Sequence, residues 1–334
     1  MRKLVLAAVL LGVVLGGCDI KRDAIGEPDR MIVIADSTDW TETETVIRQV
    51  FAPQIPTPQP ELWYDISRIS PGRFSEFQSY KNLIILSLLR EGSPSLQFIR
   101  NIFSRDLVEE MTEGNLTVAK KENPWRDEQL LLILTAPSRE KLLSVLEDRE
   151  AELRGYFDDK FVERQKEYLY SRYEQKKLER RLSEEYGWTM RIPRDWIILH
   201  ERPEEKFIWL GRHLPIRWLS VYWEESTEPV VLDSALAVDL RKMVGEEQYD
   251  SIRINPDYLH AERTTLDGRP AIRIRGIWEH EVKARGGPFL GYTYYDPDIN
   301  RLYYLDAQVF APGMSKLVFL RQLDIVLSTF QSGS

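Results

Sequence analysis

The chain has a single cysteine and only four histidines among its 334 residues. One cysteine excludes an intrachain disulfide and any metal site built from several thiolates. Four scattered histidines leave little for a histidine-rich centre, so we predict no metal and no cofactor. A basic excess is also missing, because 45 lysines and arginines stand against 53 acids and give a net charge of −8. This balance argues against a nucleic-acid partner, which usually requires a basic face.

Long hydrophobic runs are scarce as well, and the one that stands out is Leu4 to Gly17. It is shorter than the ~20 residues that a transmembrane helix needs. It follows the positive charges of Arg2 and Lys3, which is typical of a secretory signal peptide. We therefore predict that residues 1–17 are removed. The rest of the composition, 43% hydrophobic and 29% charged, indicates a globular protein, and the length favours about two domains of ~150 residues each.

The only cysteine lies directly after this run, in Leu15-Gly16-Gly17-Cys18. Small residues before a cysteine at this place resemble the lipobox of bacterial lipoproteins. The resemblance implies cleavage before Cys18, a diacylglyceryl group on its thiol and acylation of the new amino group. Several acyl chains would anchor the protein in a membrane, since one chain binds only marginally. The alternative is an ordinary cysteine in a single-pass anchor, and the choice between inner and outer membrane stays open.

Composition divides the mature chain into four segments. Residues 18–30 are polar, contain glycine and proline, and are predicted to be a tether after the lipidated cysteine. Residues 31–137 alternate apolar β-branched runs with helical patterns in the order β-α-β-α-β-α-β-β, which predicts an N-terminal α/β sandwich. Residues 138–186 are strongly charged with helical periodicity. They predict a connector that is one solvated helix or a helical hairpin, with a partner-binding helix as the alternative.

Residues 187–332 are richer in strand patterns and tryptophan. Four strands, a helix, four strands and a helix predict a C-terminal antiparallel sheet with helices on one side, so the whole chain is α+β. Side chains alternate along the last hairpin, which predicts one buried and one solvent-exposed face.

Three features of this C-terminal segment resemble the Mog1/PsbP-like fold. A strand ends at Pro193 with Trp196 close behind, residues 267–271 (Asp-Gly-Arg-Pro-Ala) open a long hairpin, and a closing helix ends at Phe330. That fold serves binding and assembly more than catalysis, so the resemblance implies a binding module.

The mature chain as a whole resembles a family of Gram-negative lipoproteins known only as a domain of unknown function. The resemblance is carried by the lipobox and by residues 32–36, 64–66, 82–85, 123–129 and 187–193. It implies a location in the cell envelope, and it brings no activity and no catalytic residues.

Nine tryptophans are many for a chain of this size, and most fall in the second half. Packing in the core of a sheet-and-helix domain is the ordinary interpretation. The alternative is an aromatic groove for a glycan, a peptide or a lipid head. The candidate residues for such a groove are Trp196, Trp209, Trp218, Trp223 and Trp278, together with Arg217 and Arg275.

The sequence contains no G-x-S-x-G elbow and no comparable nucleophilic set. We therefore expect a non-enzymatic, lipid-anchored envelope protein that binds a protein partner or a small envelope component. Its body would lie in the periplasm or at the cell surface. The alternative hypothesis is a hydrolase or transferase acting on envelope polymers through carboxylates in a C-terminal cleft, such as Asp195, Glu279 or Glu281.

Overall fold

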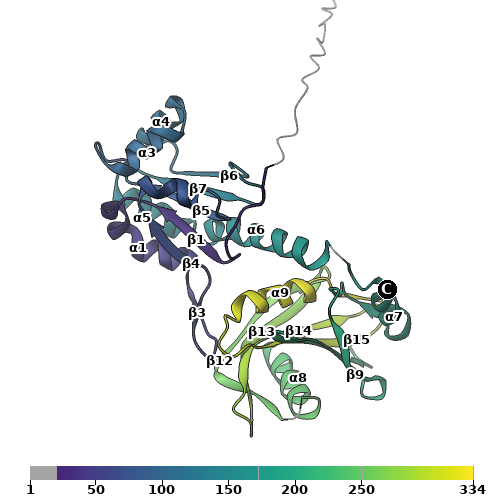
Figure 1. Cartoon of the computed structure of the whole chain (residues 1–334). Helices are drawn as coiled ribbons and strands as arrows, with labels where there is room; N and C mark the ends of the chain where they lie inside the picture. The colour runs from purple at the N-terminus through teal and green to yellow at the C-terminus, as the bar shows by residue number, and fades with distance from the viewer. Residues whose placement is uncertain (1–20, 172, 250, 334) are drawn as a thin grey trace, which may run out of the picture.

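A computed structural model describes residues 21–171, 173–249 and 251–333. Two lobes, each built on its own sheet, lie one above the other in Figure 1. The predicted signal peptide and Cys18 lie outside the described residues. Among the residues that are described, no helix is both long enough and apolar enough to cross a membrane.

The first lobe contains a five-stranded sheet with the order β4-β1-β5-β7-β6. The four strands other than β6 run parallel, and β6 pairs antiparallel with β7 at the edge. This arrangement confirms the predicted alternation of strands and helices. The strands are β1 (Arg30–Ile34), β4 (Asp65–Ile69), β5 (Asn82–Ser87), β6 (Val118–Glu122) and β7 (Leu130–Thr135).

Helices cover both faces of this sheet, which is why its central strands are continuously apolar. Leu132 of β7 faces one core with α1, α5 (Arg139–Asp148) and the start of α6 (Glu150–Tyr170), whereas Leu131 faces a second core with α3 and α4. The helices of this lobe are α1 (Ser37–Phe51), η1 (Pro71–Arg73), α2 (Phe74–Phe77), α3 (Pro94–Ile102) and α4 (Arg105–Thr112).

The charged segment 138–186 is not one solvated helix. In the described chain it forms α5 (Arg139–Asp148), α6 (Glu150–Tyr170) and α7 (Lys176–Tyr186). Leu142 and Phe157 are buried in the first lobe, whereas Phe161 and Leu182 are buried in the second. The chain therefore passes from one core to the other along α6, because apolar residues near its two ends face different lobes.

The second lobe contains a seven-stranded antiparallel sheet with the order β12-β13-β14-β15-β11-β10-β9. The antiparallel prediction is confirmed. The strands are β9 (Ile197–Arg202), β10 (Phe207–Arg212), β11 (Ile216–Glu225), β12 (Ile252–Leu266), β13 (Arg269–His280), β14 (Gly286–Asp296) and β15 (Arg301–Phe310). The lobe also contains η2 (Pro203–Glu205) and a small pair formed by β8 (Trp188–Thr189) and β16 (Gln331–Ser332).

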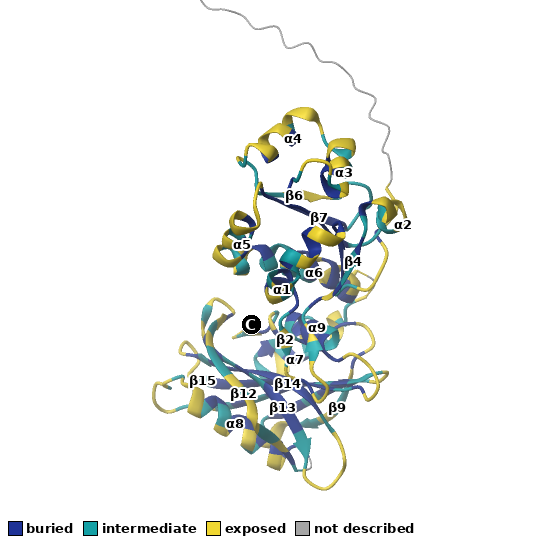
Figure 2. Cartoon of the chain, turned by 90° about the vertical axis from the view of Figure 1, so that its left-hand side faces the viewer, coloured by how far each residue is buried: buried dark blue, intermediate teal, exposed yellow. Residues whose placement is uncertain are grey.

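The helices of this lobe lie on both faces of the sheet, not on one. Leu305 packs in the cluster that includes α9 (Leu317–Leu327), and the adjacent Tyr304 packs in the cluster that includes α8 (Ser234–Glu247). Strands β14 and β15 are consequently buried on both faces, as their dark colour in Figure 2 shows. The prediction that one face of the last hairpin is exposed to solvent is therefore wrong, because α8 covers that face.

Residues 21–30 are not a free tether where the structure describes them. Ala24 donates its N–H to Asp127 O at 2.9 Å, Ile25 donates to Ser79 O at 2.8 Å, and Lys81 donates to Ile25 O at 3.0 Å. We call residues 21–29 the strap. Its backbone N–H and C=O groups form hydrogen bonds with residues near the ends of two strands. These groups are therefore paired with the protein instead of with water, although the polar composition predicted a solvated tether.

Candidate functional site

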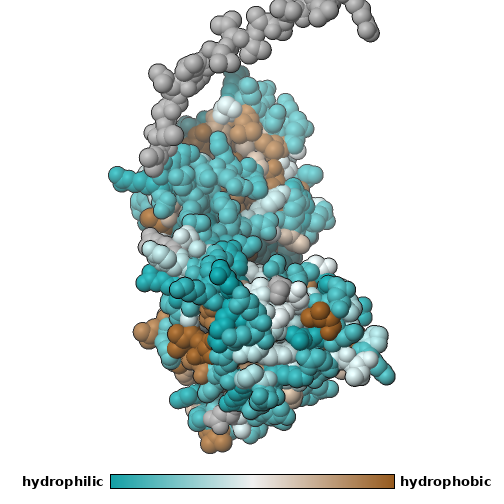
Figure 3. Space-filling view, turned by 90° about the vertical axis from the view of Figure 1, so that its right-hand side faces the viewer, coloured by the Kyte–Doolittle hydropathy of each residue, from teal (hydrophilic) through white to brown (hydrophobic). Residues whose placement is uncertain are grey.

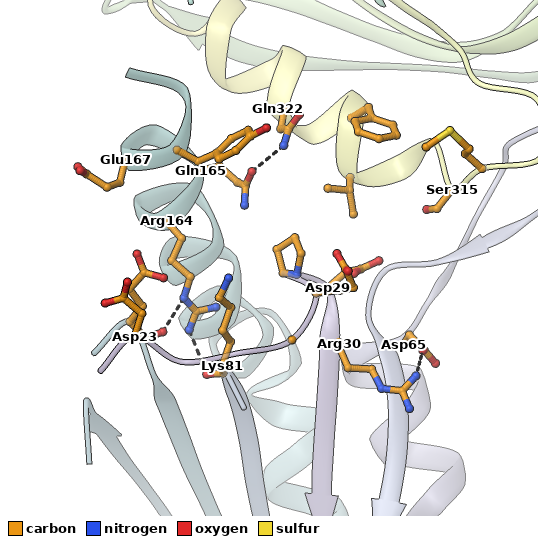
Figure 4. A pocket seen from close by; sticks show the side chains of 18 of the residues that line it. Asp23, Asp29, Arg30, Asp65, Lys81, Arg164, Gln165, Glu167, Ser315 and Gln322 are labelled. Carbon is orange, nitrogen blue, oxygen red and sulfur yellow. Dashed lines mark hydrogen bonds and ion pairs between the residues drawn. The ribbon is translucent and has the colours of Figure 1, made fainter. Parts of the chain in front are cut away.

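A cavity of about 950 Å³ lies where the two lobes meet. The strap, the amino ends of β1, β4 and β5, and the second half of α6 form the walls on the first-lobe side. The start of α9 and the loop before it form the opposite wall. Figure 4 shows Arg164 and Lys81 below this space and Gln322 and Ser315 above it. Its volume is that of a typical small-ligand site.

Arg164 of α6 is fixed to the first lobe by three hydrogen bonds. Its Nε donates to Glu128 O at 2.7 Å, its Nη1 to Asn82 Oδ1 at 2.7 Å, and its Nη2 to Lys81 O at 3.1 Å. Burial lowers the pKa of the Arg164 guanidinium to about 10. The group therefore remains charged at neutral pH and holds this wall of the cavity rigid.

The strap brings acidic groups to the cavity beside β1 and β4. Arg30 pairs with Asp65 and donates from Nη2 to Ser67 Oγ at 2.6 Å. Asp29 is less well compensated. Burial raises the pKa of the Asp29 carboxyl, and the nearby charges of Asp65 and Glu27 raise it further. A cation entering here would stabilise the ionised form of this carboxyl.

Charge and polarity differ between the two walls. Val318 and Phe319 of α9 and Met314 before it supply apolar surface. The described lining contains six carboxylates against three cationic groups, so the cavity is acidic. The carboxylates are Asp23, Glu27, Asp29, Asp65, Glu128 and Glu167, and the cations are Arg30, Lys81 and Arg164.

Arg217, a residue predicted for an aromatic groove, supports the apolar wall from behind. Its guanidinium lies 5.0 Å from the ring centroid of Phe319, and its Nη1 donates to Gln322 Oε1 at 3.0 Å. Gln322 in turn donates to Gln165 Oε1 of α6 at 2.7 Å. Burial lowers the pKa of Arg217 to about 10. Arg217 therefore positions two residues that line the cavity.

Arg321 of α9 fastens the lobes beside the cavity. Its Nη2 donates to Asp158 Oδ1 at 2.8 Å, an oxygen that also accepts from Trp63 Nε1 at 2.7 Å and Tyr64 OH at 2.9 Å. Its guanidinium lies 3.6 Å from the Phe161 ring centroid and 4.2 Å from that of Trp63. Desolvated cation–π contacts of this kind reach ~2 kcal/mol. We call these five residues the Arg321 cage.

A short hairpin makes the second connection between the lobes. Strands β2 (Gln54–Ile55) and β3 (Glu61–Leu62) reach from the first lobe to the start of α9. The Glu61 carboxylate accepts from the backbone N–H groups of Lys316 at 2.8 Å and Leu317 at 2.9 Å. A carboxylate at a helix N-terminus is favoured by the helix dipole.

The predicted tryptophans do not form one groove. Trp196 and Trp223 belong to the core cluster on the α9 face of the second sheet, whereas Trp209, Trp218 and Trp278 pack on the α8 face. Trp218 lies 5.7 Å from Trp209 and 5.8 Å from Trp278, ring centroid to ring centroid. The groove hypothesis is wrong because the sheet itself separates the two groups.

Trp223 lines a second cavity of about 430 Å³, together with Lys206, Glu225 and Arg301. Arg275 lies half-buried in β13, opposite His260 of β12 in the strand register. Among the described residues, Arg275 lines neither of these two cavities.

The carboxylates of the hydrolase hypothesis do not converge. Asp195 pairs with Arg212 at 2.6 Å beside the β9 edge of the sheet. Glu279 accepts from Asn255 Nδ2 at 2.7 Å, and Glu281 lies 3.9 Å from Arg253, both near the opposite edge. Four strands lie between β13 and β9, so the two are five strand steps apart, a width of roughly 24 Å at ~4.8 Å per step. No group of three His, Cys, Asp or Glu side chains in the described chain is arranged to hold a metal ion.

At the switch point between β1 and β5, where open α/β sheets usually bind ligands, side chains of α1 and α3 are hydrogen-bonded to backbone N–H groups. Asp36 N donates to Ser95 Oγ at 2.8 Å, and Leu88 N donates to Asp39 Oδ2 at 3.0 Å. Burial raises the pKa of the Asp39 carboxyl. These contacts join α1 and α3 to the sheet. The candidate site is therefore at the amino ends of the strands, and neither the sequence patterns nor this general rule located it.

The face in Figure 3 is mostly hydrophilic, with hydrophobic side chains in small separate patches over both lobes. This pattern is that of an ordinary water-exposed surface.

Two family models match separate parts of the chain. Residues 24–170 match a domain of unknown function, DUF8532, and residues 174–329 match another, DUF4837. The chain thus resembles two such families in succession instead of the single family that we expected. No curated protein matches.

Some solved structures are similar over 44% of this chain. A Bacteroides thetaiotaomicron protein has 10% identity and a TM-score of 0.28, and this chain covers only 46% of it. The Ran-binding protein Mog1p of Saccharomyces cerevisiae has 10% identity, 91% coverage and a TM-score of 0.32. LpqN, involved in cell envelope biogenesis of Mycobacterium tuberculosis, has 13% identity, 83% coverage and a TM-score of 0.30. Because these TM-scores are low, we assign the α+β fold class from the strand order of the two sheets and not from these similarities.

Proposed function

We propose that this chain is a lipid-anchored cell-envelope protein that binds an envelope partner in the cavity between its lobes. The acidic, partly apolar cavity carries this proposal. The lipobox-like residues before Cys18 support the membrane anchor. The role is binding or assembly, since Arg164 and the Arg30–Asp65 pair are held in place by structural contacts while the exposed carboxylates of Asp23 and Glu167 face the cavity and suit recognition.

The partner should combine positive charge with apolar surface. The excess of carboxylates favours ammonium or guanidinium groups, and the wall formed by Val318 and Phe319 favours an apolar neighbour. A basic segment of a protein partner, with apolar side chains beside its lysines or arginines, meets both requirements.

Calorimetric titration with two model peptides tests this proposal. One peptide alternates lysine with leucine, and the other replaces lysine with glutamate. The full chain in detergent should bind the lysine peptide, more weakly as salt rises, and should not bind the glutamate peptide. Equal binding of both peptides would contradict the proposal.

Two substitutions locate the binding. Glu167→Gln combined with Asp23→Asn removes two exposed carboxylates from the cavity, and the affinity should fall several-fold. Glu109→Gln removes an exposed carboxylate from α4 of the first lobe, outside the cavity lining. This control should bind like the unchanged protein. Equal losses in both variants would place the binding elsewhere.

The anchor has a separate test. Cells that express the Cys18→Ser variant should lose radioactive palmitate from this protein, and the protein should leave the membrane fraction. Continued labelling of the variant would exclude Cys18 as the lipidated residue.

A further inference from the structure

The strap is hydrogen-bonded to the first lobe from Lys21 onward, which is only three residues after the proposed lipidation site at Cys18. Lys21 donates from Nζ to Asn123 O at 2.6 Å, and Asp127 donates its N–H to Arg22 O at 3.1 Å. Ala24 is buried against the body. From Lys21 onward, the chain is therefore part of the first lobe.

The distance from Cys18 to this fixed point is short. Three residue steps separate Cys18 from Lys21 in the sequence, and an extended chain spans at most ~3.5 Å per step, or roughly 11 Å. A lipidated cysteine lies at the boundary of the hydrocarbon core. The headgroup layer of one leaflet is itself ~5–8 Å thick, so most of this length is needed to cross it.

The surface around the strap suits contact with a bilayer. Lys21 and Arg22 are exposed, and so is Lys121 on the adjacent β6, while the exposed Asp23 and Glu122 offset part of this positive charge. Ile25 exposes 54% of its surface although its backbone is bonded to the body. Basic side chains are attracted to an anionic membrane surface, and an apolar side chain among them can enter the interface.

We infer that the end of the first lobe formed by residues 21–25 with 78–80 and 121–127 docks directly on the surface of the membrane that holds Cys18. The occupant of this surface is the bilayer. This inference rests on the lipidation in the proposed function. It replaces a protein that moves freely on a tether with one held against the membrane in a fixed orientation.

Docking in this orientation also brings the cavity close to the membrane surface. Asp23, Glu27 and Asp29 of the strap line the cavity, and the same strap begins at the docked end. The strap therefore leads from the bilayer surface to the cavity wall, and a membrane-associated partner would meet the cavity close to the headgroups.

Single-cysteine fluorescence tests this orientation. A lipidated Cys18 has no free thiol, and the chain has no other cysteine. Ile25→Cys and Arg22→Cys therefore each create a unique attachment point for an environment-sensitive dye. Lys242→Cys on exposed α8, in the other lobe, is the matched control. Each protein is reconstituted into vesicles that contain headgroup-labelled quencher lipids.

The dye at Ile25 and at Arg22 should be quenched, and the dye at Lys242 should not. A flexible glycine-serine spacer of about ten residues between Ile20 and Lys21 adds roughly 18 Å of reach. This spacer should reduce the quenching at both positions without altering lipidation, because it removes the constraint that the short link imposes. Quenching at Lys242 as strong as that at Ile25 would overturn the inference, since a docked first lobe has a fixed orientation.

The experiment distinguishes failure of the docking from failure of the lipidation. Absent quenching in a protein that still carries palmitate overturns the docking and leaves the proposed function intact. Absent palmitate overturns the lipidation itself.

Discussion

At the scale of single residues, the second lobe buries an ion pair that hydrophobic patterning did not reveal. Arg241 of α8 and Asp306 of β15 are both fully buried, with Nε and Oδ1 3.2 Å apart. The guanidinium lies 4.7 Å from the Phe289 ring centroid. Asp306 also accepts from Tyr304 OH at 3.0 Å and Gln308 Nε2 at 2.7 Å. Each charge depends on the other, because neither reaches water.

Asp306→Ala should destabilise the protein strongly. It leaves the Arg241 charge buried without its counter-charge, which costs about 3–5 kcal/mol. Urea unfolding, followed by the fluorescence of the tryptophans that pack on the α8 face, measures the loss.

Two controls accompany this measurement. The double variant Asp306→Leu with Arg241→Met removes both charges and should recover most of the loss. Asp239→Ala breaks the exposed pair with Lys242 on the same helix and should change stability little. An Asp306→Ala protein as stable as the Asp239→Ala protein would contradict the interpretation.

At the scale of elements, the parity of residue spacing decides how the tryptophans are distributed. Trp218 and Trp223 lie on the same strand, β11, and their numbers differ by five. Side chains separated by an odd number of residues point to opposite faces of a regular strand. The sequence therefore contained the evidence against a common groove, and it was the concentration of tryptophan along the chain that suggested one.

The N-terminus of helix α9 is capped by a residue of the other lobe. Lys316 occupies its N-cap position, but the Lys316 Nζ donates to Met314 O at 2.9 Å. The carboxylate of Glu61 in the β2–β3 hairpin supplies the acceptor instead. The start of this helix consequently depends on the other lobe.

Glu61→Ala should cost about 1 kcal/mol, which is typical for loss of a helix cap. The amide of Leu317 should exchange its hydrogen faster, as followed by exchange mass spectrometry. Glu61→Gln keeps an oxygen acceptor and should lose less. Unchanged exchange at residues 316–318 in the Glu61→Ala protein would show that the cap contributes nothing.

At the scale of the whole molecule, the Arg321 cage and the Glu61 carboxylate join the two lobes beside the cavity, in addition to α6, which packs in both cores. The Arg321 cage lies against α6, and Glu61 lies at the start of α9. Each lobe has its own buried clusters. Loosening these contacts should therefore separate the lobes without unfolding either one.

Arg321→Met should increase the radius of gyration measured by small-angle scattering and weaken binding of the lysine peptide. Methionine loses both the hydrogen bond to Asp158 and the cation–π contacts. Arg202→Met removes contacts to Glu205 and Gln248 within the second lobe alone and is the matched control. Equal scattering curves for both variants would mean that the cage does not hold the lobes together.

The sequence by itself determined the secondary structure classes of both lobes. Continuous apolar runs at residues 83–86 and 131–134 indicated buried strands, and alternation with turn signals indicated the antiparallel sheet. It also supplied the predictions of a signal peptide and a lipidated Cys18. These are local patterns, and local patterns follow from the periodicity of helices and strands.

Only the tertiary structure decided how these elements meet. Contacts between distant parts of the chain form the strap and pack helices on both faces of the second sheet. They also form the cavity and the Arg321 cage. Glu61 and Lys316 are 255 residues apart, and Asp158 and Arg321 are 163 apart. No periodic pattern spans such separations, since the pairing is selected by the packing of whole lobes.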